Sequence, residues 1–328
     1  MFRFSQPALA AAVSLSVGAG LLGAPGAAFA ADTGSAVTAQ EMASAMTSAA
    51  AAAHQAGKSG WKSVSVFNAF GTAGSETAVY DAVNKRASLH EVYGDDEPWA
   101  GYAADGKGYY RTLDATDRAT ARMMGRPAAR YAFEANSKYT IARDFTLLPN
   151  MAELDAEDVT FAGTKTVHDD GTVDYRFTDT TATTYVSHVS AAGALTGMDI
   201  SGKGWTSTMT YTAAPQTVTL PAATAVISAS ALLKGSFYRT APHDLSFVAR
   251  DAASTAKKAA KGKNVSVKQV RTAAGKEAAA YNAFAGYPVV KVTSIKGGAR
   301  VSTTNPWTKK TVAYTVKASG KKVTVKKK

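Results

Sequence analysis

The sequence predicts an α+β protein with two domains: a curved antiparallel half-barrel sheet covered by helices, then a smaller basic domain built from a helix and an antiparallel meander. Helical periodicity gives way to strand alternation twice along the chain, with turn residues between the strands. Charge divides in the same way. Residues 222–328 hold 17 Lys and 4 Arg against 2 Asp and 1 Glu, a net +18, so the remainder sums to −6 within the overall +12.

The first 30 residues have the pattern of a secretory signal peptide. Arg3 precedes an apolar run from Pro7 to Leu22, and Ala28-Phe29-Ala30 forms a small-residue exit. The run is short of the about 20 strongly apolar residues that span a bilayer, although an uncleaved anchor stays an alternative. We therefore expect cleavage after Ala30, a secreted or extracytoplasmic protein of the cell envelope, and no nucleic-acid partner.

The chain contains no Cys. This excludes disulfides, thiolate metal sites and a cysteine nucleophile. It also excludes a lipid-acceptor cysteine after the signal peptide, where the sequence reads Ala30-Ala31-Asp32.

After a polar leader at residues 31–37, a helix is predicted to begin at Thr38. Thr38 and Glu41 form a capping-box pattern, and Met42 and Met46 lie four residues apart on one face. The pattern ends near Gln55, before the helix-stopping Gly57.

An antiparallel meander is predicted next. Residues 62–66 alternate, residues 77–92 form two strands about a turn at Asn84-Lys85, and a further turn falls at residues 105–108.

Asp114 to Met124 predicts a second helix, which ends at Gly125. The bulky stretch 131–154 predicts short helices and loops that cover an apolar surface. The sheet then resumes, closing at Leu220-Pro221, with strands expected at Val159–Val167, Val173–Thr178, Thr183–Val189, Leu195–Ile200 and Trp205–Thr212.

This order of elements resembles the LolA-like carrier fold, as in actinobacterial lipid-carrier lipoproteins of the LprG and LppX type, over about residues 38–221. The residues that carry the resemblance are the hairpin Val167-His168-Asp169-Asp170-Gly171-Thr172, the pair Tyr185 to Val189 and Ala194 to Met198, and the close Thr208 to Tyr211 with Val218 to Pro221. The resemblance implies a half-open barrel whose concave side, lidded by helices, holds acyl chains. The chain departs from those lipoproteins in lacking their lipobox Cys.

Large side chains alternating on such a sheet would line a concave apolar pocket, where each buried acyl methylene contributes about 0.8 kcal/mol. The alternative is that the same side chains simply fill the core. The candidate wall residues are Val64, Val66, Tyr80, Leu89, Tyr110, Phe161, Tyr175, Phe177, Tyr185, Met198, Met209 and Tyr211, and the candidate lid residues are Phe133, Phe145, Leu147 and Leu148.

Residues 222–241 are predicted to be a linker, and residues 242–328 a basic α+β domain whose helix begins at Pro242. Lys263 to Val267 nearly repeats Lys62 to Val66, so the second domain could be a partial copy of the first. Strands are expected at Val289–Ile295, Ala299–Thr303, Thr311–Lys317 and Lys322–Lys326.

A basic module outside the cytoplasm suits an anionic envelope polymer or membrane surface, although a solubilising surface is the alternative. The lysines predicted to bind it are Lys257, Lys258, Lys261, Lys317, Lys321, Lys322, Lys326, Lys327 and Lys328.

Enzymatic motifs are absent from the sequence: it has no nucleophile elbow, zinc-binding His pair or phosphate-binding loop, and its five His are scattered. The acidic groups at residues 95–97 and 155–158 are expected to be solvated turns. No cofactor, metal or catalytic residue is predicted. The favoured hypothesis is a non-enzymatic envelope protein that carries or senses an acyl-chain ligand; a cell-wall-associated module without lipid is the alternative, and an unrecognised hydrolase a weaker one.

Overall fold

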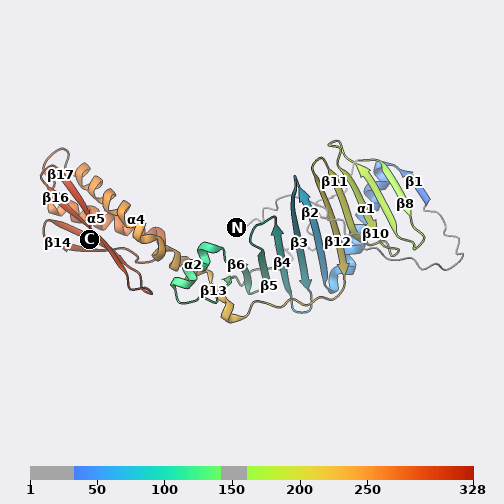
Figure 1. Ribbon diagram of the computed structural model, residues 1–328, viewed down its shortest axis with the longest axis horizontal. Coiled ribbons are helices and arrows are strands. Elements are labelled where there is room, and N and C mark those ends of the chain that lie inside the picture. The colour runs from blue at the N-terminus through green and yellow to red at the C-terminus, as the bar shows by residue number, and fades with distance from the viewer. Residues whose placement is uncertain (1–32, 142–160) are drawn as a thin grey trace. The chain divides into compact units, whose positions relative to one another are not determined.

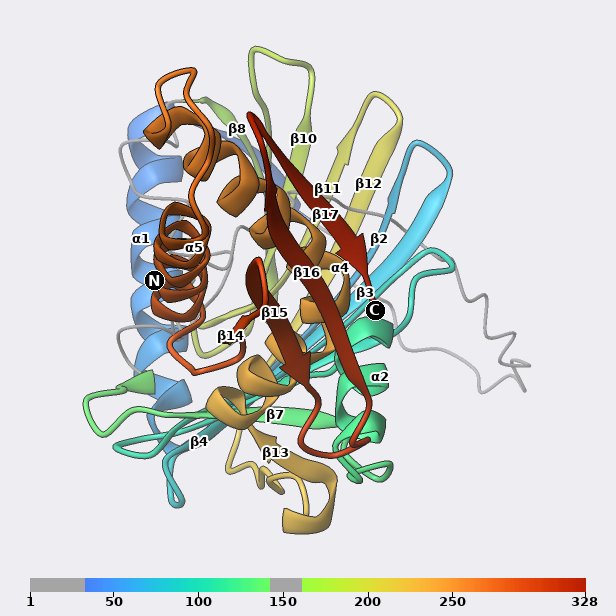
Figure 2. The same ribbon diagram turned by 90° about the vertical axis from the view of Figure 1, so that its left-hand side faces the viewer.

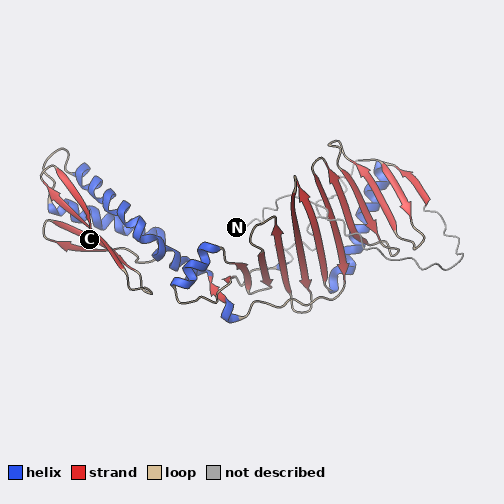
Figure 3. Cartoon of the chain, in the orientation of Figure 1, coloured by secondary structure: helices blue, strands red, loops and turns tan. Residues whose placement is uncertain are grey.

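A computed structural model describes residues 33–141 and 161–328. The chain divides into two compact units, one formed by residues up to Arg111 with Ala135–Leu220, the other by Thr112–Glu134 with Pro221–Lys328. Helices and antiparallel strands occur in both, and a large sheet is separate from a small four-stranded one, which confirms the α+β class (Figure 3). In the described part of the chain, no helix has the length and apolarity needed to cross a membrane.

Two meanders form the sheet of the first unit (Figure 1). One runs through β2 (Trp61–Ala69), β3 (Thr72–Asp81), β4 (Arg86–Tyr93), β5 (Trp99–Ala104) and β6 (Gly108–Thr112). The other runs through β8 (Gly163–Val167), β9 (Val173–Thr178), β10 (Thr184–Val189), β11 (Leu195–Gly202) and β12 (Trp205–Ala213). They join where β12 pairs antiparallel with β2, in the strand order β1-β8-β9-β10-β11-β12-β2-β3-β4-β5-β6.

The predicted first helix is confirmed as α1 (Ala39–Ala56), followed by the 3-10 turn η1 (Gly57–Ser59). Thr38 caps it, and Glu41 completes the capping box by accepting from the Thr38 backbone N–H at 2.7 Å. Its buried stripe consists of Met42, Met46, Ala49 and Ala53. The small Ala side chains let the helix axis lie close to β11, which it contacts.

The face of this sheet that packs against α1 is called here the inner face. On β2 it carries Trp61, Ser63 and Ser65, whose register partners on β3 are Tyr80, Ala78 and Glu76. Side chains alternate along a strand, so Lys62, Val64 and Val66 lie on the opposite, outer face.

The polar leader differs from expectation. Thr33–Val37 forms an edge strand, β1, paired antiparallel with β8. Its side chains are almost all exposed, so the strand is held through backbone hydrogen bonds and needs no apolar alternation, the signal on which strand prediction depends.

The second unit contains α2 (Ala115–Met123), the 3-10 turn η2 (Ala223–Ala225), α4 (Ala229–Ala259) and α5 (Val267–Ala285). Two short strands, β7 (Tyr131–Ala135) and β13 (Val226–Ser228), pair in parallel. The small sheet consists of β14 (Lys291–Ile295), β15 (Gly298–Thr304), β16 (Thr311–Ser319) and β17 (Lys322–Lys327), which confirms the predicted meander. Both α4 and α5 pack on one face of it (Figure 2).

Residues 229–241 are helical, so the predicted linker at 222–241 and the predicted helix start at Pro242 both differ from the structure. Ser228 caps α4, and Pro242 lies inside it. An internal Pro costs a helix about 3 kcal/mol. Apolar burial on both sides offsets this cost, because Leu232 packs in the cluster formed with α2 and Leu245 in the core beneath the small sheet.

The segment that suggested a partial repeat differs in structure from its counterpart in the first unit. Ser266 is the N-cap of α5 in a capping box with Gln269, so the segment that resembles residues 62–66 begins a helix instead of a strand. A five-residue match does not determine which hydrogen bonds its residues make. Here its last two residues, Ser266 and Val267, begin a helix.

The stretch predicted to form helices and loops contains a strand, because Tyr131–Ala135 is β7. The predicted helix before it is confirmed as α2, capped by Asp114, but it belongs to the second unit and not to a single 38–221 domain. The remainder of that stretch, residues 142–154, lies outside the described residues.

The capping box of α5 gives a stability prediction. Ser266→Ala removes the side chain that accepts from the Gln269 N–H, and should lower the free energy of unfolding by about 1 kcal/mol in urea denaturation. The matched control is Ser254→Ala within α4, where Ala is the better helix former. Equal losses in the two variants would contradict the cap assignment.

Candidate functional site

Apolar side chains gather on the inner face beneath α1. Ala49 and Ala53 of the helix pack with Trp61, Met198 and Met209 in one buried cluster. Next to it, three aromatic rings stack in a row: Phe161 lies 6.1 Å from Phe177, and Phe177 lies 4.8 Å from Tyr185, measured between ring centroids. The face is therefore lined by aromatic rings and thioethers, side chains that adapt to apolar ligands.

The structure brings most of the predicted wall residues together. The strand register and the buried clusters place these on the inner face or packed beside it: Tyr80, Leu89, Phe161, Tyr175, Phe177, Tyr185, Met198, Met209 and Tyr211.

Three predicted wall residues, Val64, Val66 and Tyr110, lie on the outer face. Val64 and Val66 alternate with Ser63 and Ser65, and the two serines are the buried residues. The sequence itself indicates this arrangement. Ser63 and Ser65 are two and four positions from Trp61, so all three side chains lie on the same face of the strand. Tyr110 is displaced in the same way, because its partner Tyr102 alternates with the inner-face Gly101 and Ala103.

Most of the predicted lid lies outside the described residues. Phe133 lies in β7 and belongs to the second unit. Phe145, Leu147 and Leu148 fall outside the described part of the chain. Instead, Tyr139 and Ile141 are buried against Ala87 and Ala103, over the part of the inner face made by β4 and β5.

Buried polar atoms without a hydrogen-bond partner occur beneath α1. They are Trp61 Nε1, Ser187 Oγ and Tyr211 OH, all on the inner face; in the described residues the remaining one is Thr303 Oγ1. The Trp61 and Tyr211 rings lie 6.0 Å apart, and both approach Gly57, where an added Cβ would meet Tyr211 OH at 2.8 Å and Trp61 Cδ1 at 3.4 Å. Burial also raises the pKa of Tyr211, so its hydroxyl keeps its proton and can act as a donor.

A pair of carboxyl groups that sequence analysis missed lies on the same face. Glu76 of β3 stands directly opposite Glu91 of β4. Burial, with a further contribution from the Glu91 charge, raises the pKa of Glu76 to about 7, and burial raises that of Glu91. The groups are fifteen positions apart in sequence, and only the hairpin register makes them neighbours.

Chemically, this pair can hold or release one proton near neutral pH. When protonated, Glu76 can donate a hydrogen bond to an acceptor oxygen, a role that a normal surface carboxylate cannot fill. No ion pair to either Glu is found in the described residues, so nothing there neutralises the two charges.

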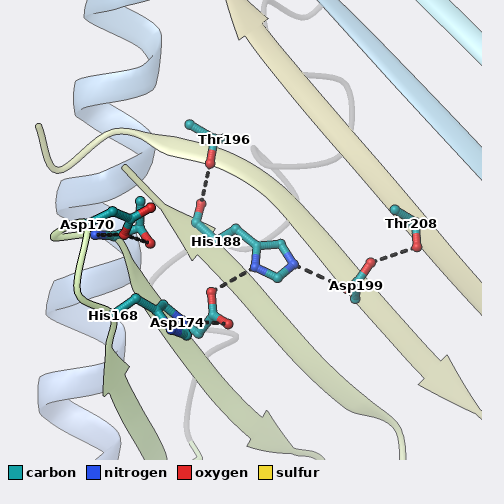
Figure 4. A network of polar contacts seen from close by, with 8 residues as sticks. His168, Asp170, Asp174, His188, Thr196, Asp199 and Thr208 are labelled. Carbon is teal, nitrogen blue, oxygen red and sulfur yellow. Dashed lines mark hydrogen bonds and ion pairs between the residues drawn. The ribbon is translucent and has the colours of Figure 1, made fainter. Parts of the chain in front are cut away.

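The outer face holds a different polar group, centred on His188 (Figure 4). Its Nδ1 lies 2.8 Å from Asp174 Oδ1, and its Nε2 lies 3.2 Å from Asp199 Oδ2. His168 contacts the other oxygen of Asp174 at 3.2 Å, and Thr208 donates to Asp199 at 2.7 Å. These contacts connect β9 to β12 across the sheet.

This network does not form a metal centre or a buried catalytic dyad. The side chains of His188, Asp174 and Asp199 are 37%, 30% and 49% exposed. Among the described residues, no group of His, Asp and Glu has the arrangement to hold a metal ion. The contacts link neighbouring strands on a solvated face and so have a structural role.

The predicted anion-binding lysines fall in two places within the second unit. Lys257, Lys258 and Lys261 are exposed at the C-terminal end of α4. The others lie on or beside the last two strands of the small sheet: Lys317, Lys321, Lys322, Lys326, Lys327 and Lys328.

Comparison with known proteins gives distant structural likeness only. No family model matches the chain, and no curated protein matches its sequence. One similar solved structure is LprF from Mycobacterium bovis, at 10% identity and a TM-score of 0.29, covering 56% of this chain and 96% of that one. Another is a DUF1329 family protein from Desulfovibrio piger, also 10% identical, with a TM-score of 0.18, covering 56% of this chain and 93% of that one.

The carboxyl pair gives a pH-dependent prediction. A raised native pKa means that the unfolded chain releases the Glu76 proton first, so the protein loses stability as pH rises from about 4.5 towards 7. Glu76→Gln should therefore match the wild type near pH 4 and exceed its free energy of unfolding by about 1–2 kcal/mol at pH 8. Urea denaturation at the two pH values measures this, and an equal difference at both would contradict it.

The outer-face network gives a second prediction. His188→Ala removes the group between Asp174 and Asp199 and should cost about 0.5–1 kcal/mol of unfolding free energy, because the imidazole contacts with both partly exposed carboxylates are lost. The comparison variant is His90→Ala, whose ring makes an edge contact with Tyr102 at 5.4 Å on the same face. If His188→Ala lowers the free energy of unfolding no more than His90→Ala does, the contacts of His188 do not stabilise the sheet.

Proposed function

We propose that the first unit binds an acyl-chain ligand on its inner face, as a secreted carrier or sensor of the cell envelope, and that the basic second unit holds the protein at anionic envelope material. The observation that carries the proposal is the combination of an aromatic and thioether-lined inner face with three buried, unpartnered polar atoms on that same face. Most buried polar groups in folded proteins are hydrogen-bonded, so three unpartnered ones on a single face call for an explanation.

The lining suits a hydrocarbon chain. Met198 and Met209 are flexible thioethers that fill variable space, and the stacked rings of Phe177 and Tyr185 present flat apolar surfaces. Each methylene transferred there contributes about 0.8 kcal/mol, so a chain of ordinary acyl length suffices for tight binding.

The unpartnered atoms indicate the chemistry of the ligand's polar end. Trp61 Nε1 can only donate, and the hydroxyls of Ser187 and Tyr211 each have a proton to donate. The complement of such donors is an acceptor oxygen, as in an ester or carboxyl group. Trp61 and Tyr211 meet beside Gly57, so we place that oxygen at the C-terminal end of α1.

Attachment through charge takes the place of a lipid anchor in this proposal. The chain has no Cys to acylate, and the net +18 of residues 222–328 supplies an electrostatic alternative. No catalytic group is required, since binding and release complete the task.

The test is native mass spectrometry of the full secreted chain, followed by delipidation and reloading with a fluorescent diacyl phospholipid. We expect a co-purifying or exchangeable lipid in one-to-one ratio. A protein that neither carries nor takes up lipid would overturn the proposal in favour of a wall-associated module without ligand.

Two conservative variants assign the site. Tyr211→Phe and Ser187→Ala each remove an unpartnered hydroxyl, so the lipid-free protein should keep or gain up to about 1 kcal/mol of stability while lipid affinity falls about three- to tenfold. Thr210→Ala, exposed on the outer face of β12, is the matched control and should leave affinity unchanged. If lipid affinity is unchanged in all three variants, the Tyr211 and Ser187 hydroxyls do not contact the ligand.

A further inference from the structure

The face of the small sheet that its helices leave uncovered carries several exposed cations. Helices α4 and α5 cover one side, where Val301, Val316 and Val325 are directed into the core. Alternation directs the intervening residues to the other side. This side, called here the cationic face, presents Lys291, Arg300, Lys317, Lys322 and Lys326, all exposed.

The strand register spaces these charges regularly. Arg300 and Lys326 both oppose Thr315, one on each side, and Lys317 opposes Gly298 and Thr324. The Thr315 and Thr324 hydroxyls donate to the backbone carbonyls of Lys326 and Lys317, at 3.4 and 3.5 Å. Small hydroxyl residues thus separate the cations and hold their strands together, leaving the charged ends directed to solvent.

Nothing in this part of the chain neutralises the charges. No Asp or Glu follows Glu277 in the sequence. In the described residues, none of the five cations makes an ion pair. Lys317 is the diagonal neighbour of both Lys322 and Lys326, and diagonal residues lie within reach of long side chains, so like charges here oppose folding.

The cationic face has no large exposed apolar side chain among its described residues, and this favours some anionic partners over others. A face that inserts into a bilayer carries Trp, Phe or Leu between its cations. The large exposed hydrophobic side chains of this unit, Leu233, Phe247 and Phe284, lie on α4 and α5 instead. The face also presents no exposed aromatic ring on which a nucleic-acid base could stack.

We propose that the cationic face binds a linear polyol-phosphate polymer of the cell envelope, with successive phosphates lying against successive cations. The proposal names the partner of the basic unit and therefore rests on the attachment part of the proposed function. A phosphodiester chain supplies evenly spaced single negative charges, which match cations distributed over neighbouring strands.

The experiment measures binding of the full secreted chain to purified glycerol-phosphate polymer, with two further arms: vesicles of phosphatidylglycerol in phosphatidylcholine, and single-stranded DNA. One variant carries Arg300→Gln, Lys317→Gln and Lys326→Gln. Its matched control carries Lys257→Gln, Lys258→Gln and Lys261→Gln, the same loss of charge at the end of α4. Circular dichroism checks that both fold.

The face variant should bind the polymer about a hundredfold more weakly, at about fivefold for each cation removed, and the control variant less than about threefold more weakly. Wild-type binding should weaken steeply with added salt, and Lys317→Arg should retain it. Equal losses in the two variants, or preference for vesicles or DNA over the polymer, would overturn the proposal. Binding to vesicles alone would contradict the polymer proposal but still support attachment of the basic unit to anionic envelope material. Absence of binding to all three anions would contradict both proposals.

Discussion

The pairing of β12 with β2 is the contact on which the first unit depends. It joins two meanders that are separated in sequence, and its register sets Tyr211 opposite Ser63 and Met209 opposite Ser65. Because side chains alternate, a slip of one residue would turn every inner-face residue of one meander to solvent. The large residues of β12 are accommodated because their β2 partners are small. Complementary sizes across one strand pair thus establish the apolar surface on which α1 lies.

Sequence patterns located the elements of this fold well and its faces less well. Turn residues and alternation placed β9 at its observed bounds and β10 to β12 within two residues, and the Thr38 capping box located the start of α1. Hydrophobicity alone predicts that Val64 and Val66 form the inner face of β2. Close packing against the adjoining strand favours size over hydrophobicity here, and Ser63 and Ser65 are the buried residues. Tertiary contacts likewise carry α4 through Pro242, against its local preference.

The unusual polar groups of the inner face and the arrangement of the lysines could not be predicted from the sequence, for a related reason. Glu76 and Glu91 become neighbours only through the register of β3 with β4, and nothing local marks either as unusual. Trp61, Ser187 and Tyr211 come from three strands, and their lack of partners is a property of the packed interior. The lysines of the small sheet were predicted from composition, but their division between one sheet face and the end of α4 needed the strand pairing.

The two faces of the large sheet differ in how their polar groups are paired. On the outer face His188 bonds two carboxylates, and one of them accepts from Thr208 as well. On the inner face, where desolvation makes each unsatisfied polar atom cost about 1–3 kcal/mol, three such atoms and two unneutralised carboxyl groups persist. Folding alone favours the reverse distribution, with the pairing inside and the unpaired groups in water. We infer that the inner face retains this cost because a ligand, once bound, supplies the missing partners.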